Sequence, residues 1–437
     1  MTTAPAPARH STSRVVLRRS HLACTGAFLI GALPVIDEWY PLPRLGITPF
    51  LAIAIALGLS GLKVPVTGHA RSVLRRYRRL AVPFAAWVLL SSAVSGSFGS
   101  LYAAASFGLW LVLLIPGLAR LLQVESTRRW LVNGIAFGAL IILVVSTSRL
   151  LSGSPVLDRV AGDALGGSIL GVNRNLANIV VLTAVSLTAF NRALPRWYRL
   201  VFLVMAVAWI LGSEGRSGLV GLIALPIVWG LLSSGRGPRV IRALQASLGV
   251  LLVAILLSQF GGMEIAAVGR LTTVSATDLD SSDEARVLLI DKAVGLARDH
   301  PLFGVGFGRF IEEDHEALDS ASSAVVRMTA STANAHNTYL ELAATSGIVG
   351  GLLFVGFAVN LLRIALASRA RDPVSQVAVV TWALLLVVIA LLSAGGAALY
   401  LPASLALNAA LREPAAPTTS EARPRVVTAP ARRRRSR

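Results

Sequence analysis

The sequence has little charge and almost no cysteine, and both shortages exclude classes of protein. Only 14% of its 437 residues are charged, 54% are hydrophobic, and the mean hydropathy is +0.69. These values exclude a soluble multidomain protein and indicate a polytopic membrane protein. The single cysteine, Cys24, excludes an intrachain disulfide and argues against a cysteine-based metal site. Lysine is scarce too, because every basic residue except Lys63 and Lys292 is arginine.

Apolar runs of about 17 to 25 residues, or shorter where charge bounds both ends, predict about twelve membrane-spanning helices. The predicted spans are 22–36, 46–62, 80–95, 100–119, 130–147, 169–190, 198–212, 217–232, 241–259, 340–362, 374–393 and 395–411. No small-residue cleavage site cleanly follows the first run, which predicts a retained helix rather than a signal peptide. The predicted fold class is therefore all-α, a polytopic integral membrane protein with one large extracytoplasmic loop that contains helices.

Acidic residues are few on one side of this predicted topology, and basic residues are few on the other. With a cytoplasmic N-terminus, 30 of the 41 basic residues and 4 of the 22 acidic residues fall on the inner side. This positive-inside asymmetry predicts that both termini are cytoplasmic. The formal net charge of +19 is then topological and does not indicate a nucleic-acid partner.

No convincing internal repeat divides the chain, and the absence of matching halves weakens the case for a transporter. The predicted organisation is a cytoplasmic segment 1–21, nine spans over 22–259, an extracytoplasmic loop 260–339, three spans over 340–411 and a tail 412–437. The tail is rich in proline, alanine, threonine and arginine, so we expect it to be disordered and to contact anionic lipid.

The large loop contains one clear helix signal. Ser281 and Glu284 stand at capping-box spacing, and the helix is predicted to run over 283–299, before Pro301. Arg286 falls on the apolar side of this helix, where a guanidinium group is costly unless it meets an anion or a wet site. The alternative is an arginine that snorkels or pairs with a structural carboxylate. Acidic residues 278–284 could bind Mg²⁺, but a solvated acidic loop is the simpler account.

Two further motifs close the loop. The string HPLFGVGFGRF lacks a surrounding βαβ unit, so its three glycines predict a tight turn toward the membrane rather than a nucleotide site. Thr338 and Glu341 then stand at capping-box spacing, which predicts a helix start near Thr338. His336 and Asn337 precede that helix, whose first amides favour anions. The alternative for His336 is an inert, hydrogen-bonded interfacial histidine.

Two other motifs face outside. SEGRSG places Arg216 in the turn between the seventh and eighth spans, where the simple alternative is a surface ion pair with Glu214. GVNRNLAN places Arg174, Asn175 and Asn178 at the outer end of the sixth span. Amides there could bind sugar hydroxyls or cap the helix.

These segments together resemble the bacterial O-antigen ligase and O-antigen polymerase superfamily. The resemblance covers roughly the second half of the chain, from GVNRNLAN through SEGRSG and DEARVLLIDKAVGLARDHPLFGVGFGRF to NAHNTYLELAATSGIVGG. It implies a glycosyltransferase that moves a glycan from an undecaprenyl-diphosphate carrier to an acceptor hydroxyl at the outer face of the bacterial inner membrane. The acceptor would be a lipopolysaccharide core sugar, another repeat unit or a protein hydroxyl, the last making it a protein O-oligosaccharyltransferase.

The resemblance and the chemistry of the reaction assign the same roles. Arginine stays charged and binds phosphate bidentately, so two arginines would hold the diphosphate and stabilise the departing charge, and no metal or cofactor is implied. Histidine, with an ordinary pKa of about 6.5, would accept the proton of the acceptor hydroxyl in an inverting displacement. The predicted catalytic residues are Arg216, Arg286 and His336, and the predicted substrate-binding residues are Arg174, Asn175, Asn337 and Tyr339.

Two other functions remain open from the sequence. A transporter or flippase of a lipid-linked glycan would need charged residues near the span centres, whereas here they gather at the outer ends. A non-catalytic scaffold of an envelope complex is the third possibility.

Overall fold

A computed structural model describes most of the helical chain. The described residues are 12–32, 49–152, 168–169, 172–189, 195–212, 216–232, 281–331, 333–367, 373–389 and 396–412. The first helices are α1 (Thr12–Ala32), α2 (Pro49–Leu62), α3 (Gly68–Val94), α4 (Phe98–Leu109), the π-helical turn η3 (Trp110–Leu114), α5 (Ile115–Leu121) and α6 (Glu125–Leu151). They are followed by α7 (Arg174–Ala189), α8 (Arg196–Gly212), α9 (Arg216–Leu232), α12 (Ser281–Asp299), the 3-10 turn η4 (Glu316–Ser320), α13 (Ala324–Ser331), α14 (Thr338–Ala367), α15 (Pro373–Val388) and α16 (Gly396–Leu411).

The all-α prediction is confirmed for the described residues, apart from one small hairpin. Two-residue strands β1 (Ser168–Ile169) and β2 (Val172–Asn173) pair antiparallel, with Ser168 opposite Asn173. Helix α7 begins directly after β2, so the sixth predicted span starts at Arg174 and not at 169.

The predicted spans coincide with helices, except that 241–259 lies outside the described residues. Within the described residues, three stretches are long and apolar enough to cross a membrane: Phe98–Leu121, Glu125–Arg149 and Thr338–Ala367. Shorter apolar helices lie at His21–Ala32, Phe50–Leu62, Ala177–Thr188, Gly218–Val228, Val374–Val388 and Leu399–Leu411. The chain is therefore a helical membrane protein, while the number twelve stays a prediction.

Helix α3 is longer than the apolar run that predicted it. The run suggested 80–95, but the helix begins at Gly68, and the Thr67 side chain caps it by accepting from the amide of Ala70 at 3.3 Å. The basic segment 71–79 is therefore helical, because capping and good helix-forming arginines extend the helix beyond the apolar stretch.

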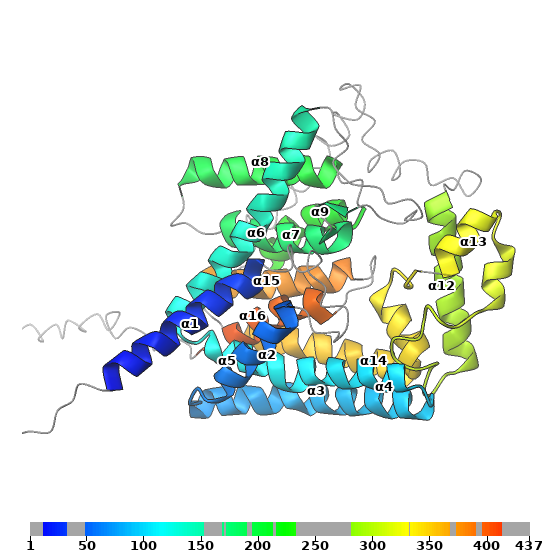
Figure 1. Cartoon of the computed structure of the whole chain (residues 1–437), viewed down its shortest axis with the longest axis horizontal. Helices are drawn as coiled ribbons and strands as arrows, with labels where there is room; N and C mark the ends of the chain where they lie inside the picture. Colours follow the sequence, from blue (N-terminus) through cyan, green and yellow to red (C-terminus); the bar gives the residue numbers. More distant parts are fainter. Residues whose placement is uncertain are drawn as a thin grey trace, which may run out of the picture.

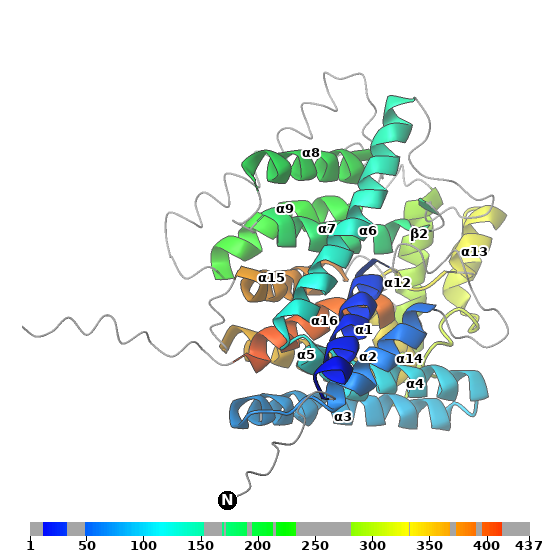
Figure 2. The same ribbon diagram turned by 60° about the vertical axis from the view of Figure 1, so that its left-hand side comes forward.

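Helices α1 to α9 and α14 to α16 pack into one bundle, and α12 and α13 lie at one end of it (Figures 1 and 2). Helix α12 runs across the end of the bundle, roughly perpendicular to α3 and α14 (Figure 1). We call residues 281–335, with α12, η4 and α13, the outer lobe. It has its own apolar core, which includes Leu289, Leu296 and Phe310.

Arginine side chains connect the helices at the opposite end of the bundle. Arg120 donates to the backbone oxygens of Leu62 and Val64, and Glu125 pairs with Arg128 at 2.6 Å and with Arg412 at 3.3 Å. These contacts bring the α2–α3 corner, the start of α6 and the end of α16 together.

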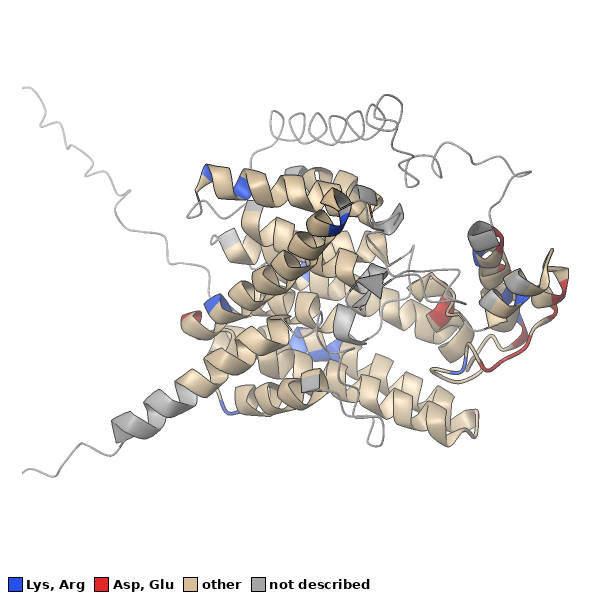
Figure 3. Cartoon of the chain, turned by 45° about the horizontal axis from the view of Figure 1, so that its top comes forward, with Lys and Arg blue, Asp and Glu red and all other residues tan. Residues whose placement is uncertain are grey.

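Most of the described acidic residues lie at one end of the molecule, whereas the described basic residues are spread more widely (Figure 3). Every described acidic side chain except Glu125 belongs to the segment from Glu284 to Glu341. Acidic residues therefore gather at the outer-lobe end, whereas the opposite end carries the arginine contacts around Glu125.

The helix predicted for the loop is confirmed, and it begins two residues earlier, at Ser281. Glu284 has a different partner from the predicted capping box. Its two carboxylate oxygens accept from the amide and hydroxyl of Ser322, at 2.7 and 2.5 Å. These bonds lower the pKa of Glu284 below its usual range and fasten the segment before α13 to α12. Of the other acids considered for Mg²⁺, Asp278 and Asp280 lie outside the described residues, and Asp283 lies in the first turn of α12.

Lys292 is fully buried in the outer lobe. Its Nζ has no hydrogen-bond partner in the described part of the chain and lies 4.9 Å from the centre of the Phe310 ring. Burial lowers the pKa of Lys292, and the carboxylates of Asp314 and Glu313 oppose that shift. A buried ammonium group that faces a ring and makes no hydrogen bond within the described residues is costly even with carboxylates in the same lobe, so this residue should destabilise the lobe in its charged form.

Replacing Lys292 with methionine is expected to raise the stability of the outer lobe by on the order of 1 kcal/mol. The pKa of Lys292 is lower in the folded than in the unfolded chain, where it is near 10.5. The unfolded chain therefore binds more protons between these two values, and wild-type stability should rise with pH across that window. Thermal unfolding of the purified protein at several pH values measures both effects.

Lys63 provides the matched control, because it is the other lysine of the chain and is exposed. Lys63→Met should leave the stability and its pH dependence unchanged. A Lys292→Met variant that is less stable than wild type would show that the buried ammonium group is stabilising and would overturn this account.

Candidate functional site

Helix α14 is broken at Gly347, within the motif that opens the last group of spans. Gly347 has φ 75° and ψ 169°, a conformation outside the helical region and open essentially to glycine alone. The break separates a short helix, 338–346, from the long apolar helix that follows. The predicted span 340–362 is therefore two helical pieces that meet at an angle.

The glycine-rich turn of HPLFGVGFGRF fills this break. The amide of Val305 donates to Ala344 O at 3.0 Å, and the amide of Gly306 donates to Thr345 O at 2.9 Å. In return, the amide of Ile348 donates to Pro301 O at 2.9 Å. The groups that the break releases from helical bonding are thus satisfied by the turn, as buried backbone groups require. The tight turn predicted from the glycines is confirmed, and we call this arrangement the interlock.

Helix α3 holds the interlock from the other side. The Trp87 indole donates to Ser346 O at 2.8 Å and stacks on Phe303, with ring centres 5.3 Å apart. The Ser91 hydroxyl contacts the oxygens of Phe303 and Thr345. Residues of α3, in the first half of the chain, therefore stabilise motifs of the second half. The sequence did not indicate these contacts.

His336 lies just before the first piece of α14, on a backbone that is unusual for its residue type. Its φ is 50°, and it is the one non-glycine residue with a positive φ in the part of the chain that the structure describes. The left-handed conformation costs a non-glycine residue about 1–2 kcal/mol. Such residues cluster at functional sites, where the surrounding structure holds them in place. The side chain of His336 is half-buried.

Asn337, and not Thr338, caps α14. Its Oδ1 accepts from the amides of Tyr339 and Leu340, each at 3.1 Å. The amide of Thr338 donates to Ile389 O at 3.0 Å. The first amides of the helix already have acceptors inside the protein, so they are not the free anion-binding donors that the sequence suggested. The Tyr339 hydroxyl donates to Leu386 O at 2.7 Å, a contact with the end of α15.

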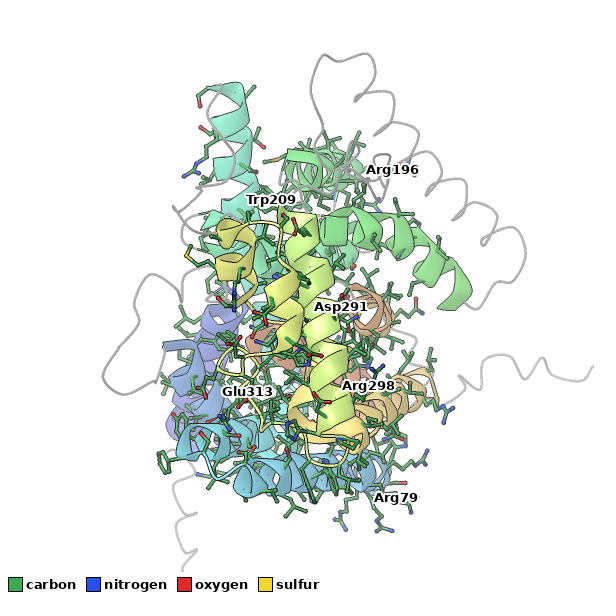
Figure 4. All side chains as sticks on the ribbon, turned by 90° about the vertical axis from the view of Figure 1, so that its right-hand side faces the viewer. Arg79, Arg196, Trp209, Asp291, Arg298 and Glu313 are labelled. Carbon is green, nitrogen blue, oxygen red and sulfur yellow. The ribbon has the colours of Figure 1, made fainter. Side chains whose placement is uncertain are left out.

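Arg286 lies on α12 in the outer lobe, with a half-buried side chain. Figure 4 looks at this end of the molecule from outside and labels the exposed residues Asp291 and Arg298 on α12. Asp291 is five residues beyond Arg286, or about 140° around the helix. Arg286 therefore lies on the other half of α12, and this helix packs against α14, which His336 precedes.

The other predicted residues begin two helices of the bundle. Arg216 is the first residue of α9, and Arg174 and Asn175 are the first two residues of α7. The side chains of these three residues lie outside the described part of the structure. Helices α7 and α9 pack together, and α15 packs against both of them and against α14. Arg286 and the helix that His336 precedes therefore belong to one pair of neighbouring helices, α12 and α14. Arg174 and Arg216 belong to a second pair, α7 and α9. Helix α15 packs against α14 and against both helices of the second pair.

The end of α15 connects these pairs of helices, and the sequence did not indicate this connection. Leu386 and Ile389 accept from the Tyr339 hydroxyl and the Thr338 amide, and both acceptors are backbone oxygens. Backbone acceptors leave no trace in residue type, so no sequence signal could have found them. Gly347 was visible in the motif SGIVGG, but glycines in apolar helices commonly serve close packing.

This arrangement defines a class of helical membrane proteins that have a folded lobe at one end of the helical bundle. The candidate arginine and histidine residues lie around that lobe. Residues 200–355 match the family model described as O-Antigen ligase. The match confirms the resemblance to the O-antigen ligase and polymerase superfamily, and it includes Arg216, Arg286, His336 and the whole turn-and-break motif. Arg174, Asn175 and α3 lie outside it. A comparison with curated proteins found no match.

Proposed function

We propose that the protein is an O-antigen ligase-like glycosyltransferase that moves a glycan from an undecaprenyl-diphosphate carrier to an acceptor hydroxyl. The family match gives the coarser conclusion, a membrane enzyme of the ligase or polymerase type that takes a lipid-linked glycan and an acceptor. The observation that carries the finer proposal is His336, held in the left-handed conformation inside the matched segment and directly before α14, the helix that packs against the helix of Arg286.

The proposed chemistry needs a proton acceptor and a cradle for a leaving diphosphate. His336 accepts the proton as the acceptor oxygen attacks the anomeric carbon, and the carbon–diphosphate bond breaks on the opposite face, which inverts the configuration. Arg286 and Arg216 stabilise the departing charge and stand in for a metal ion. Arg174 and Asn175 are proposed to contact the substrate from the start of α7.

Asn337 and Tyr339 have a more limited role in this proposal. Their Oδ1 and hydroxyl already bond within the protein, so we assign them to the positioning of His336. Asn337 caps the helix that follows His336, and Tyr339 fixes that helix to the end of α15. Any contact of these two residues with substrate would use their remaining atoms.

We propose that the outer lobe faces the outside of the bacterial inner membrane, with both termini in the cytoplasm. The separation of described acidic residues from the arginine contacts around Glu125 supports this orientation under the positive-inside rule. The donor headgroup, exposed after its transfer across the membrane, would then meet the catalytic loop 260–339. The predicted tail beyond Arg412 lies outside the described residues.

Mass spectrometry of lipid-linked and surface glycans in a deletion strain tests the proposal. A lost ligase leaves full-length chains on the carrier lipid, which is the expected result. A lost polymerase leaves single repeat units capped onto acceptors, which would favour the related polymerase reaction. Carrier-linked glycan retained on the cytoplasmic side would contradict the proposal and favour a flippase.

A further inference from the structure

Asn178 is a fully buried polar residue at the junction of three helices. It lies in α7, and its Oδ1 accepts from the Nε1 of Trp209 in α8 at 3.0 Å. Trp209 is fully buried as well. The sequence suggested that Asn178 binds sugar or caps a helix, but in the structure it lies inside α7 and bonds to a neighbouring helix.

The third helix, α9, rests directly on the Asn178 amide. A Cβ added at Gly218 would stand 3.1 Å from the Cγ, Nδ2 and Oδ1 of Asn178. Gly218 lies two residues after Arg216, in the first turn of α9. The flat amide of Asn178 and the absence of a side chain at Gly218 therefore set how closely the start of α9 approaches α7.

The side-chain amide of Asn178 also carries a hydrogen-bond donor that is not used in the described part of the structure. Nδ2 of Asn178 is buried and has no hydrogen-bond partner among the residues that the structure describes. A buried amide hydrogen without an acceptor destabilises a fold, so an apolar residue would serve packing alone better. Asn178 is also four residues after Arg174, and therefore on the same face of α7 as the first residue of that helix. The contacts among Asn178, Trp209 and Gly218 thus connect the start of α7, which carries Arg174, with the start of α9, which carries Arg216.

We propose that Asn178 is a positioning residue of the glycan-transfer site, which fixes the first turn of α9 and so places Arg216 beside the start of α7. This inference rests on the proposed function. Arg216 would act on the diphosphate as negative charge develops, so a shift of about 1 Å should cost up to about 100-fold in turnover. The Michaelis constant for the acceptor should change little, because the acceptor is not the group that Arg216 holds.

The kinetic test uses Asn178→Ala and Trp209→Phe, which remove the two partners of one hydrogen bond. Each variant should lower kcat about 10- to 100-fold in reconstituted membranes. In an Arg216→Ala background the same changes should have almost no further effect, since Asn178 acts through Arg216. Ser186→Ala is the control, because Ser186 is a buried residue of α7 whose hydroxyl donates within its own helix, to Leu182 O. It should retain wild-type turnover.

A distance measurement keeps the inference separate from the proposed function. Cys24 is the single cysteine, so Cys24→Ser allows paired spin labels at positions 174 and 216. We expect Asn178→Ala to shift or broaden the distance between the labels and Ser186→Ala to leave it unchanged. If wild type transfers no glycan but the distance responds, the proposed function fails and the positioning role stands. An unchanged distance, or losses that multiply with that of Arg216→Ala, would overturn the positioning role.

Discussion

His336→Ala is expected to lower glycan transfer by about 10²- to 10⁴-fold, the usual contribution of a general base. The reason is the loss of the group that takes the proton from the acceptor hydroxyl. The side chain is half-buried at the start of α14 rather than part of the apolar cores, so the variant should accumulate in the membrane as wild type does. Surface glycan and turnover by the purified variant measure the effect.

Two other substitutions separate the backbone of His336 from its imidazole. Asparagine tolerates the left-handed conformation, so His336→Asn should fold normally and remain inactive. Glycine relieves the conformational cost at φ 50°, so His336→Gly should be inactive but more stable by about 1 kcal/mol. Normal surface glycan in His336→Ala, at normal protein levels, would remove histidine from the reaction.

Gly347→Ala is expected to prevent accumulation of folded protein. An added Cβ would lie 1.9 Å from Leu302 O and 2.3 Å from its carbonyl carbon, and the φ of 75° already disfavours alanine. Relief would require opening the interlock, which places this change among the exceptional substitutions that cost more than about 4 kcal/mol. Membrane level and monodispersity after detergent extraction measure the outcome.

Gly356 in the same helix provides the control. An added Cβ there would meet only the Cδ1 of Leu80 at 3.7 Å, an ordinary contact. Gly356→Ala should therefore be neutral or stabilising by about 0.5–1 kcal/mol. If Gly347→Ala accumulates and unfolds like Gly356→Ala, the break in α14 does not depend on glycine and the interlock is wrong.

The parts of the fold that follow from local pattern were predictable from the sequence. Apolar runs located the spans, the 283–299 pattern located α12, and the glycines of HPLFGVGFGRF gave a turn. Each of these depends on residues close in the chain, where periodicity and backbone preference decide the structure. The start of α14 was also found, although Asn337 rather than Thr338 caps it.

The contacts that shape the candidate site were not predictable in the same way. The break at Gly347 is stabilised by amides about 40 residues earlier in the chain and by Trp87 and Ser91 of α3. Asn178 looked like an outer polar residue but packs between helices, because only the tertiary structure brings Trp209 and Gly218 to it. The hydrogen bonds at the break use backbone oxygens, which every residue carries.

We infer that this chain alone transfers a lipid-linked glycan, and reconstitution of the purified protein tests that inference. Purified protein in liposomes would be given an undecaprenyl-diphosphate-linked glycan and an acceptor, with His336→Ala in parallel. We expect glycosylated acceptor with release of undecaprenyl diphosphate for wild type, and almost none for His336→Ala. Wild-type protein that moves the carrier across the bilayer without forming product, or a His336→Ala variant as active as wild type, would contradict it.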